Sequence, residues 1–361
     1  MNTSIAAEPD LERAWKVLRE GIAQRVFPGA AAAITLAGEL IALRGFGRLT
    51  YEENVPEVTG ETIFDVASLT KVMAATSMAM VLYERGVLDL DARVAAMAPE
   101  FVGGGERGSV TVRHLLSHTS GLPAYEKLFA QAHTREELIA AACRAPLVAR
   151  PGDHVEYSDI GFIVLGAVLE RLADEPIDTF CAREIFGPLG LSRTGYRPPS
   201  EWREQIPPTE DDRAFRQRAI QGEVHDENAS VMGGVSAHAG LFAPAADVAT
   251  FAEWMLHGGT PILRPDTVKL FTSPQPVRSG NARALGWDRV SQPSQSGRYF
   301  SGSAYGHLGF TGTSLWIDPE RRLSVTMLTN RTWPHRESQP IKQLRPAFHD
   351  AVMEALGFAR T

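Results

Sequence analysis

The sequence predicts an α+β fold, an α/β sandwich plus an all-helical domain, in which an antiparallel sheet flanked by terminal helices carries a large helical insert. Strand-like runs occur near both ends, at 29–47 and 307–331, helix-like patterns fill most of the chain between them, and each end carries a helix. We therefore expect a discontinuous α/β domain of residues 1–65 and 240–361, a mainly helical domain of residues 66–239, and an active site at their interface.

The elements near the N-terminus follow from the spacing of apolar residues. Leu11, Trp15, Leu18 and Ile22 recur at helical intervals, which predicts a first helix. After Pro28 and Gly29 break this pattern, two β-like runs surround residues 37–39, which predicts a hairpin.

The insert and the C-terminal elements are predicted in the same way. Helical patterns cover residues 160–174 and 246–259. A second hairpin is expected to turn at residues 318–320. The last helix is expected to start near Pro346, which suits a first helical position, and to stop at Gly357.

Composition limits the classes of partner. The net charge is -7 with both signs interspersed, so no basic patch indicates binding to nucleic acid. No apolar run is long enough to span a membrane, and the start has no secretory signal; we expect a cytoplasmic protein, or a periplasmic one if a leader was removed. Cys143 and Cys181 form no spaced motif and are expected to be reduced core thiols. Dinucleotide and P-loop fingerprints are absent, so we expect no cofactor.

Ser68 and Lys71 form the first candidate catalytic pair. They stand three apart in a stretch, predicted helical from about residue 66 to 85, that is apolar nearly all round and should be buried. Burial lowers the pKa of a lysine, which could then accept the proton of the serine hydroxyl. The start of the helix also offers free backbone N–H groups beside Ser68. The alternative is that Lys71 reaches the surface and Ser68 caps the helix.

Two further stretches favour the catalytic interpretation. Tyr157 lies on a loop before a helix and could share the proton transfer, although it could instead be a surface tyrosine with Ser158 or Asp159 as the helix N-cap. Gly309 and Gly312 interrupt a strand, as happens where a ligand approaches the backbone, and His307 points to the same face as Gly309.

A pair of histidines has the spacing of half a zinc site. His114 and His118 stand four apart, but Leu115 occupies the position where a metalloprotease needs glutamate. We expect no metal, and we expect His118 to be a buried, hydrogen-bonded residue opening a loop.

Together these stretches resemble the serine β-lactamase and penicillin-binding protein superfamily, most closely its class C β-lactamase-like (family VIII) carboxylesterases. The similar stretches are FDVASLTK with Ser-x-x-Lys, YSD where the family has Tyr-x-Asn, HLLSHTSGLP, and the segments 224–242 and 307–331. The resemblance implies a β-lactamase/transpeptidase-like fold, Ser68 as acylated nucleophile and Lys71 as its proton acceptor. It also implies that Tyr157 protonates the leaving group and helps to activate the deacylating water.

The resemblance further implies an oxyanion hole made by the backbone N–H groups of Ser68 and Phe310, since Phe310 follows the glycine of the third motif, Gly309. Two positions depart from the family pattern. Asp159 replaces asparagine, adds charge beside Lys71 and favours its protonated form. His307 stands where the family has a lysine that attracts the substrate carboxylate, and a neutral histidine is a weaker anchor.

Both departures favour a neutral acyl substrate over a β-lactam. The leading hypothesis is therefore an esterase acting on a small-molecule ester through a Ser68 acyl-enzyme, with Asp159, His307, Gly309 and Tyr125 facing the substrate. The alternatives are a β-lactamase, D-alanyl peptidase or D-amino-acid amidase using the same residues, and a scaffold that has lost catalysis. No Gly-x-Ser-x-Gly elbow is present, which excludes the α/β-hydrolase route to an esterase.

Overall fold

A six-stranded antiparallel sheet organises the computed structural model, which describes residues 9–280, 283–291, 294–337 and 339–359. The strand order is β2-β1-β11-β10-β9-β8. The strands are β1 (Gly29–Leu36), β2 (Glu39–Gly47), β8 (Asp288–Arg289), β9 (Tyr305–Leu308), β10 (Ser314–Asp318) and β11 (Leu323–Thr329). Strands from the two ends of the chain share this sheet and meet where β1 pairs with β11.

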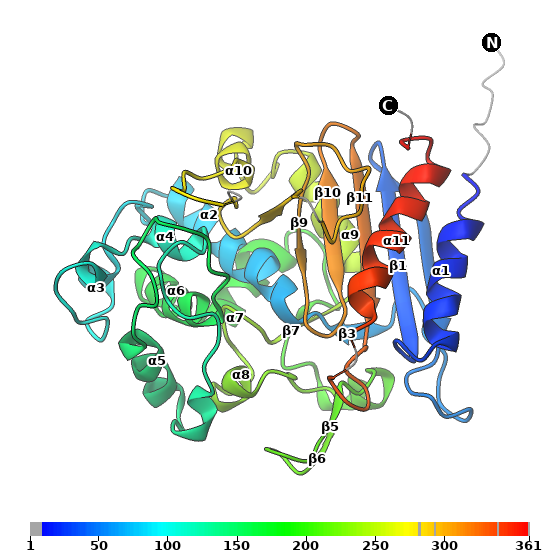
Figure 1. Ribbon diagram of the computed structural model, residues 1–361, viewed down its shortest axis with the longest axis horizontal. Coiled ribbons are helices and arrows are strands. Elements are labelled where there is room, and N and C mark those ends of the chain that lie inside the picture. Colours follow the sequence, from blue (N-terminus) through cyan, green and yellow to red (C-terminus); the bar gives the residue numbers. More distant parts are fainter. Residues whose placement is uncertain (1–8, 281–282, 292–293, 338, 360–361) are drawn as a thin grey trace.

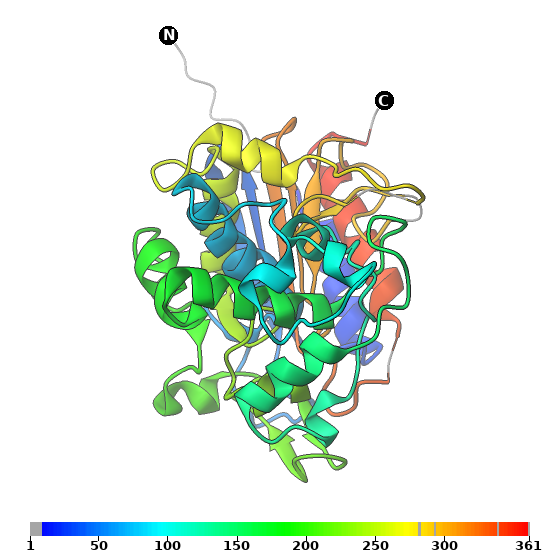
Figure 2. The same ribbon diagram turned by 90° about the vertical axis from the view of Figure 1, so that its left-hand side faces the viewer.

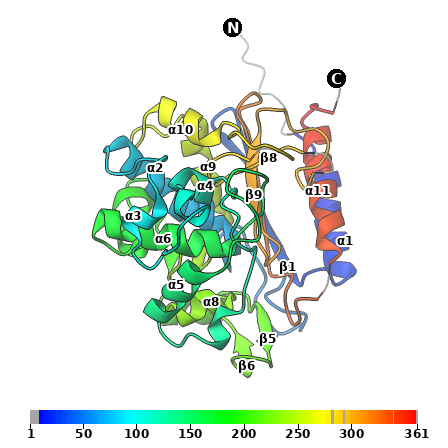
Figure 3. The same cartoon turned by 60° about the vertical axis from the view of Figure 1, so that its left-hand side comes forward.

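The two terminal helices cover one face of this sheet, as the sequence predicts. The helices α1 (Glu12–Ala23) and α11 (Ile341–Ala355) contact each other and form one apolar cluster with the strands, which includes Trp15, Phe348 and Trp316. Figures 1 and 3 show both helices on the same side of the sheet, with the other helices on the opposite side.

The helical region fills the opposite layer and is anchored on the sheet by α9 (Ala245–Leu256), which contacts β1, β10 and β11. Figure 2 looks onto this layer. Its other α-helices are α2 (Ser77–Glu84), α3 (Val94–Met97), α4 (Val112–Leu116), α5 (Arg135–Arg144), α6 (Asp159–Ala173), α7 (Ile177–Cys181), α8 (Glu227–Val231) and α10 (Pro265–Thr272). Short 3-10 or π turns cover Ala67–Leu69, Lys71–Thr76, Arg107–Ser109, Leu128–Ala130, Ala182–Phe186 and Ser200–Gln205. The helices predicted at 160–174 and 246–259 are confirmed.

Both predicted hairpins are present. The first turns at Ala37 and Gly38, whose φ angles of 56° and 95° lie in the left-handed region that a tight two-residue turn requires. The second joins β10 to β11 immediately after Asp318. Cys143 and Cys181 are buried free thiols, as expected.

Two predictions about the C-terminal elements are wrong. The last helix starts at Ile341 and carries Pro346 inside it. A proline there removes the N–H that would bond to Lys342, but the side-chain amide of Gln295 donates to that carbonyl at 3.0 Å, so the helix continues. In addition, Gly309 and Gly312 do not interrupt one strand; they lie in the turn between β9 and β10.

Two small sheets complete the fold. One has the order β3-β7-β4 and the other pairs β5 with β6. Their strands are β3 (Ile63–Asp65), β4 (Gly195–Tyr196), β5 (Glu210–Asp212), β6 (Arg218–Ile220) and β7 (Leu241–Pro244). The strand β3 leads directly into Ser68 and β7 follows His238, so this sheet brings the two chain segments around the candidate nucleophile together. Within the described ranges, no helix has the length and apolar character needed to cross a bilayer.

Candidate active site

Ser68 lies on a tight turn at the end of β3. The preceding residue, Ala67, has a φ of 47°, an uncommon conformation for a residue with a side chain. The carboxylate of Asp65 accepts the Ala67 N–H at 2.8 Å, and Thr70 donates its hydroxyl to the Ala67 carbonyl at 2.6 Å. These bonds hold the strained turn, which leaves Ser68 half-buried while its neighbours are buried.

The helix that follows is less regular than the sequence suggests. Residues 67–69 form a 3-10 turn, Lys71–Thr76 form a π-helical turn, and regular α-helix begins only at Ser77. The predicted burial of this segment is correct, since Lys71–Leu82 are all buried. A π turn is a common feature of functional sites, and here it begins at the candidate proton acceptor.

The side chain of Lys71 is fully buried and contacts three oxygens. Its Nζ lies 3.1 Å from Oγ of Ser68 and 2.8 Å from the backbone carbonyl of His238. It also lies 2.6 Å from Oδ1 of Asp159. Lys71 therefore does not extend to the surface, and its ammonium is directed at the candidate nucleophile.

The charge state of Lys71 differs from the first expectation. Burial acts to lower the pKa of Lys71, but the opposite effects of the Asp159 carboxylate and of Tyr157 exceed it, and the pKa is raised. The pKa depression expected from burial alone is therefore wrong, whereas the direction expected from the Asp159 carboxylate agrees with this result. The departure at position 159 therefore determines the resting state, in which Lys71 is protonated.

Tyr157 lies beside both residues. Its hydroxyl hydrogen-bonds with Ser68 and Lys71, and Nζ of Lys71 lies 5.1 Å from the centre of its ring. Burial raises the pKa of Tyr157, and the nearby Lys71 opposes that rise. The structure thus brings Ser68, Lys71 and Tyr157 into one hydrogen-bonded group.

The loop carrying Tyr157 is fixed by His118, which is buried and hydrogen-bonded as expected. Its Nδ1 accepts the Ser158 N–H at 3.0 Å, and its ring lies between Tyr157 and Phe162 at centroid distances of 4.6 and 4.9 Å. Ser158, not Asp159, is the N-cap of α6, since its hydroxyl accepts the Gly161 N–H at 2.8 Å. The carboxylate of Asp159 is thereby left to pair with Lys71.

The turn between β9 and β10 packs against the nucleophile turn. The hydroxyls of Thr311 and Thr313 donate to the carbonyls of Asp65 and Val66 at 2.8 and 3.0 Å. A Cβ at Gly309 would lie 2.6 Å from the Val66 carbonyl oxygen, so this approach requires glycine.

Phe310 follows Gly309 at this contact, with a side chain that is 47% exposed. Among the hydrogen bonds found for the described residues, neither the Ser68 N–H nor the Phe310 N–H donates to a protein acceptor. This arrangement suits a pair of oxyanion donors.

His307 is buried and lies near the catalytic group, with its ring 5.9 Å from that of Tyr157. Its Nδ1 contacts the Leu308 carbonyl at 2.8 Å, and its Nε2 has no hydrogen-bond partner. Burial, together with the positive charges of Arg283 and Lys71, lowers its pKa well below the usual range. The histidine is therefore neutral, and the pairing of β8 with β9 ends at Gly306, one residue before it.

Tyr125 is 40% exposed and lies close enough to Asp159 for that carboxylate to affect its pKa. Its hydroxyl lies 3.5 Å from the carboxylate of Glu227, which also pairs with Arg336 at 2.9 Å. Burial and the nearby Asp226 and Glu227 raise its pKa, so the hydroxyl stays protonated.

One set of residues near the site was missed by sequence reasoning. His238, whose carbonyl accepts from Lys71, bonds to Asp226 at 2.8 Å and to Ser236 at 2.7 Å. Both Ser236 and His238 are about 1% exposed, so this Ser-His-Asp chain is inaccessible to a substrate and acts to fix the loop. In the sequence, these residues were indicated only by their position in the segment 224–242, which resembles the family.

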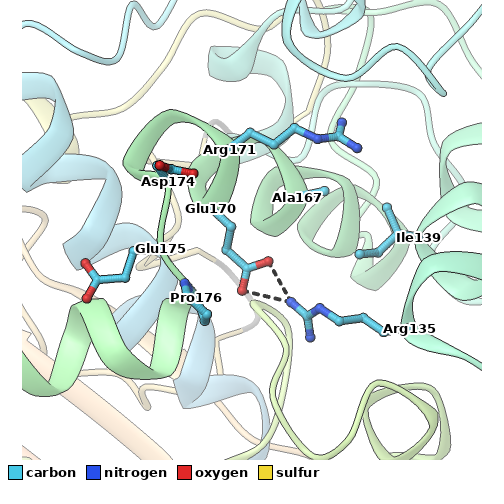
Figure 4. A pocket seen from close by; sticks show the side chains of 8 residues that line it. All are labelled: Arg135, Ile139, Ala167, Glu170, Arg171, Asp174, Glu175 and Pro176. Carbon is cyan, nitrogen blue, oxygen red and sulfur yellow. Dashed lines mark hydrogen bonds and ion pairs between the residues drawn. The ribbon is translucent and has the colours of Figure 1, made fainter.

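Other features do not contribute to this site. The pocket of about 380 Å³ in Figure 4 lies between α5, α6 and the start of α7, and contains none of these residues. Within it Arg135 already pairs with Glu170. Among the described residues, no group of three or more His, Cys, Asp or Glu side chains is arranged to hold a metal ion.

Residues 15–346 match the family described as Beta-lactamase, and the chain belongs to that family. It is a hydrolase of the serine β-lactamase and penicillin-binding protein superfamily, with the β-lactamase/transpeptidase-like fold. It is 33% identical over 343 residues to an N-acetylmuramyl-L-alanine amidase of Bacillus subtilis (strain 168), covering 84% of this chain and 77% of the relative. It is 32% identical over 328 residues to a putative D-alanyl-D-alanine carboxypeptidase of Escherichia coli (strain K12), covering 80% and 73%.

Solved structures share the fold. EstCE1, a hydrolase with promiscuous acyltransferase activity, is 24% identical with a TM-score of 0.77, covering 94% of this chain and 97% of the other. The octameric penicillin-binding protein homologue from Pyrococcus abyssi is 23% identical with a TM-score of 0.74, covering 96% and 78%.

Proposed function

We propose that this hydrolase cleaves carboxylic esters of small molecules through an acyl-enzyme on Ser68. The observation that carries the proposal is the convergence of Lys71 Nζ and the Tyr157 hydroxyl on the Ser68 hydroxyl, beside two unused backbone N–H groups.

Acylation begins when the Ser68 hydroxyl loses its proton to the Lys71–Tyr157 pair and Oγ attacks the acyl carbon. The N–H groups of Ser68 and Phe310 stabilise the resulting oxyanion. Tyr157 then passes a proton to the leaving alkoxide, which departs as the alcohol. In deacylation a water loses its proton to the Lys71–Tyr157 pair and attacks the acyl carbon. The pair then returns a proton to Oγ of Ser68 as the carboxylic acid leaves.

The resting protonation state limits the first step. Lys71 is held as an ammonium by Asp159 and cannot accept a proton in that form. The active form has therefore lost one proton from the coupled pair of Lys71 and Tyr157, and turnover rises with pH as that proton leaves.

The charges around the site favour an uncharged acyl group. The position of the family's anchoring lysine holds the neutral, buried His307. The nearby cations Arg283 and Arg336 already pair with carboxylates, Asp288 at 3.0 Å and Glu227 at 2.9 Å. A substrate carboxylate would therefore find weaker attraction here than beside an unpaired lysine.

A second candidate function is hydrolysis of D-alanyl peptides or related amides. The names of the two relatives, an amidase and a putative D-alanyl-D-alanine carboxypeptidase, favour it. The same three residues would perform that reaction, so the two functions differ in the substrate rather than in the mechanism.

The two functions are separated by one panel of substrates. We would measure kcat/KM for a short-chain p-nitrophenyl ester, a chromogenic cephalosporin and a D-alanyl-D-alanine peptide under identical conditions. Fast ester cleavage with little turnover of the other two supports the esterase. Peptide or cephalosporin hydrolysis without ester turnover overturns it in favour of the second function.

A further inference from the structure

Arg345 is a buried cation that pairs with backbone carbonyls instead of a carboxylate. It lies on α11 with 6% of its surface exposed. Its Nη2 donates to the Gly309 carbonyl at 2.6 Å, and its Nε to the Gly312 carbonyl at 3.4 Å. Within the described part of the chain, no ion pair to Arg345 is found.

This arrangement is costly. Burial and the neighbouring charge of Arg331 lower the pKa of Arg345, which means that both disfavour its charged form. A buried charge without a counter-ion is rare in proteins unless its hydrogen bonds are well satisfied. The carbonyls of the turn after β9 supply these bonds, so the terminal helix and the turn are coupled through one guanidinium.

The Gly309 carbonyl belongs to the same peptide group as the Phe310 N–H. A charged donor on a carbonyl oxygen withdraws electron density from the amide and makes its N–H a stronger donor. The Gly309 oxygen also accepts the Gly312 N–H at 3.1 Å. Two donors therefore polarise the Gly309–Phe310 peptide group, in the turn that packs against Val66 and Ala67 just before Ser68.

The turn is arranged so that this N–H remains available. The Gly309 N–H donates to the Thr313 carbonyl at 2.8 Å, and the Phe310 carbonyl accepts from Nε of Arg331 at 2.7 Å. The Phe310 N–H donates to no protein acceptor among the hydrogen bonds of the described residues.

We propose that Arg345 is a positioning residue for the oxyanion hole: its guanidinium orients and polarises the Gly309–Phe310 peptide so that the Phe310 N–H stabilises the negative oxygen of the transition state. The proposal rests on the proposed function, which makes that N–H an oxyanion donor. By this proposal a residue of the C-terminal helix α11 contributes to stabilising the oxyanion, although it lies 277 positions after Ser68 in the chain (345 − 68).

The test compares Arg345→Gln with Arg289→Gln. Arg289, on β8, is the control because it also donates to backbone carbonyls, those of Gly302 at 2.6 Å and Thr272 at 3.0 Å, and neither acceptor belongs to the turn at 309–313. For each variant we would measure kcat and KM for a p-nitrophenyl ester, and Ki for a trifluoromethyl ketone with the same alkyl chain. The ketone adds to the serine and forms an oxyanion that occupies the hole.

For Arg345→Gln we expect kcat to fall about 10-fold, less than the 10²–10³-fold loss of a whole donor, with KM changed less than about twofold. The Ki of the ketone should rise in parallel with the loss of kcat/KM. Arg345→Lys keeps the charge and should recover part of the loss, which also tests the proposal if the glutamine variant does not fold. Arg289→Gln should leave all three values unchanged.

The proposal is overturned if folded Arg345→Gln binds the ketone as tightly as wild type. Where only Arg345→Lys folds, the same result for that variant overturns it. It is equally overturned if Arg345→Gln and Arg289→Gln lose activity to the same extent. Failure of the proposed function has a different signature: Ser68→Ala would retain ester turnover, or the wild type would cleave no ester while hydrolysing peptides.

Discussion

The ammonium of Lys71 lies 2.6 Å from the carboxylate of Asp159, and 3.1 Å from the hydroxyl of Ser68. The same cation is therefore held by a counter-ion and directed at the candidate nucleophile. This pair raises the pKa of Lys71 despite complete burial of the side chain, and it determines how the site should respond to pH.

Asp159→Asn should move the pH dependence of ester hydrolysis to lower pH. Asp159 raises the pKa of Lys71, so its removal lowers that pKa, and the deprotonated active form appears earlier as pH rises. The measurement is kcat/KM against pH for wild type and variant. An unchanged acidic limb would show that Lys71 is not part of the titrating set.

Lys71→Ala should reduce kcat/KM by several orders of magnitude, because both the proton acceptor and the partner of Tyr157 are lost. It should also destabilise the fold by about 3–5 kcal/mol, since the carboxylate of Asp159 is left in a mostly buried position without its cation. Urea unfolding and ester kinetics measure the two effects. Lys127→Ala, at an exposed position, is the control, and near-normal activity of Lys71→Ala would contradict the mechanism.

Tyr157→Phe should slow both acylation and deacylation, because the hydroxyl contacts both Ser68 and Lys71 while the ring packing against His118 is preserved. Stopped-flow measurements of p-nitrophenol release separate a burst from the steady state. If neither rate changes, the proton transfers belong to Lys71 alone.

His307→Ala should act mainly on substrate binding, because the neutral ring lies beside Tyr157 with its Nε2 unpaired. We expect KM to rise for the ester while kcat falls little. Thermal unfolding is measured alongside, since removing a buried ring leaves a cavity. A lower kcat with unchanged KM would mean that His307 acts on the chemistry instead.

Much of the fold follows from local patterns. Alternating and helical spacing gave both hairpins, the first helix and the buried segment after Ser68. The start of α11 could not be predicted, because the bond that makes Pro346 tolerable comes from the side chain of Gln295, far away in the sequence. The turn at 309–313 resembles one interrupted strand in the sequence, since its shape depends on contacts with Asp65 and Val66.

The candidate site shows the same division. Motif spacing identified Ser68, Lys71 and Tyr157, and the structure brings them together. The charge state of Lys71 depends on the balance between burial and a carboxylate that the fold brings within 2.6 Å, and that balance is not encoded in spacing. The contact of the His238 carbonyl with Lys71 could not be predicted from residue type either, because any residue can supply a backbone oxygen.

The central claim is that Ser68 carries ester hydrolysis, and one measurement tests it most directly. Hydrolysis of a short-chain p-nitrophenyl ester is compared between wild type, Ser68→Ala and Ser273→Ala. Ser273 is the control serine, since its hydroxyl donates to the Lys269 carbonyl of α10 at 2.6 Å, away from the site. Circular dichroism verifies that all three are folded. The account predicts that Ser68→Ala alone loses turnover. Ester cleavage by folded Ser68→Ala at the wild-type rate would contradict it.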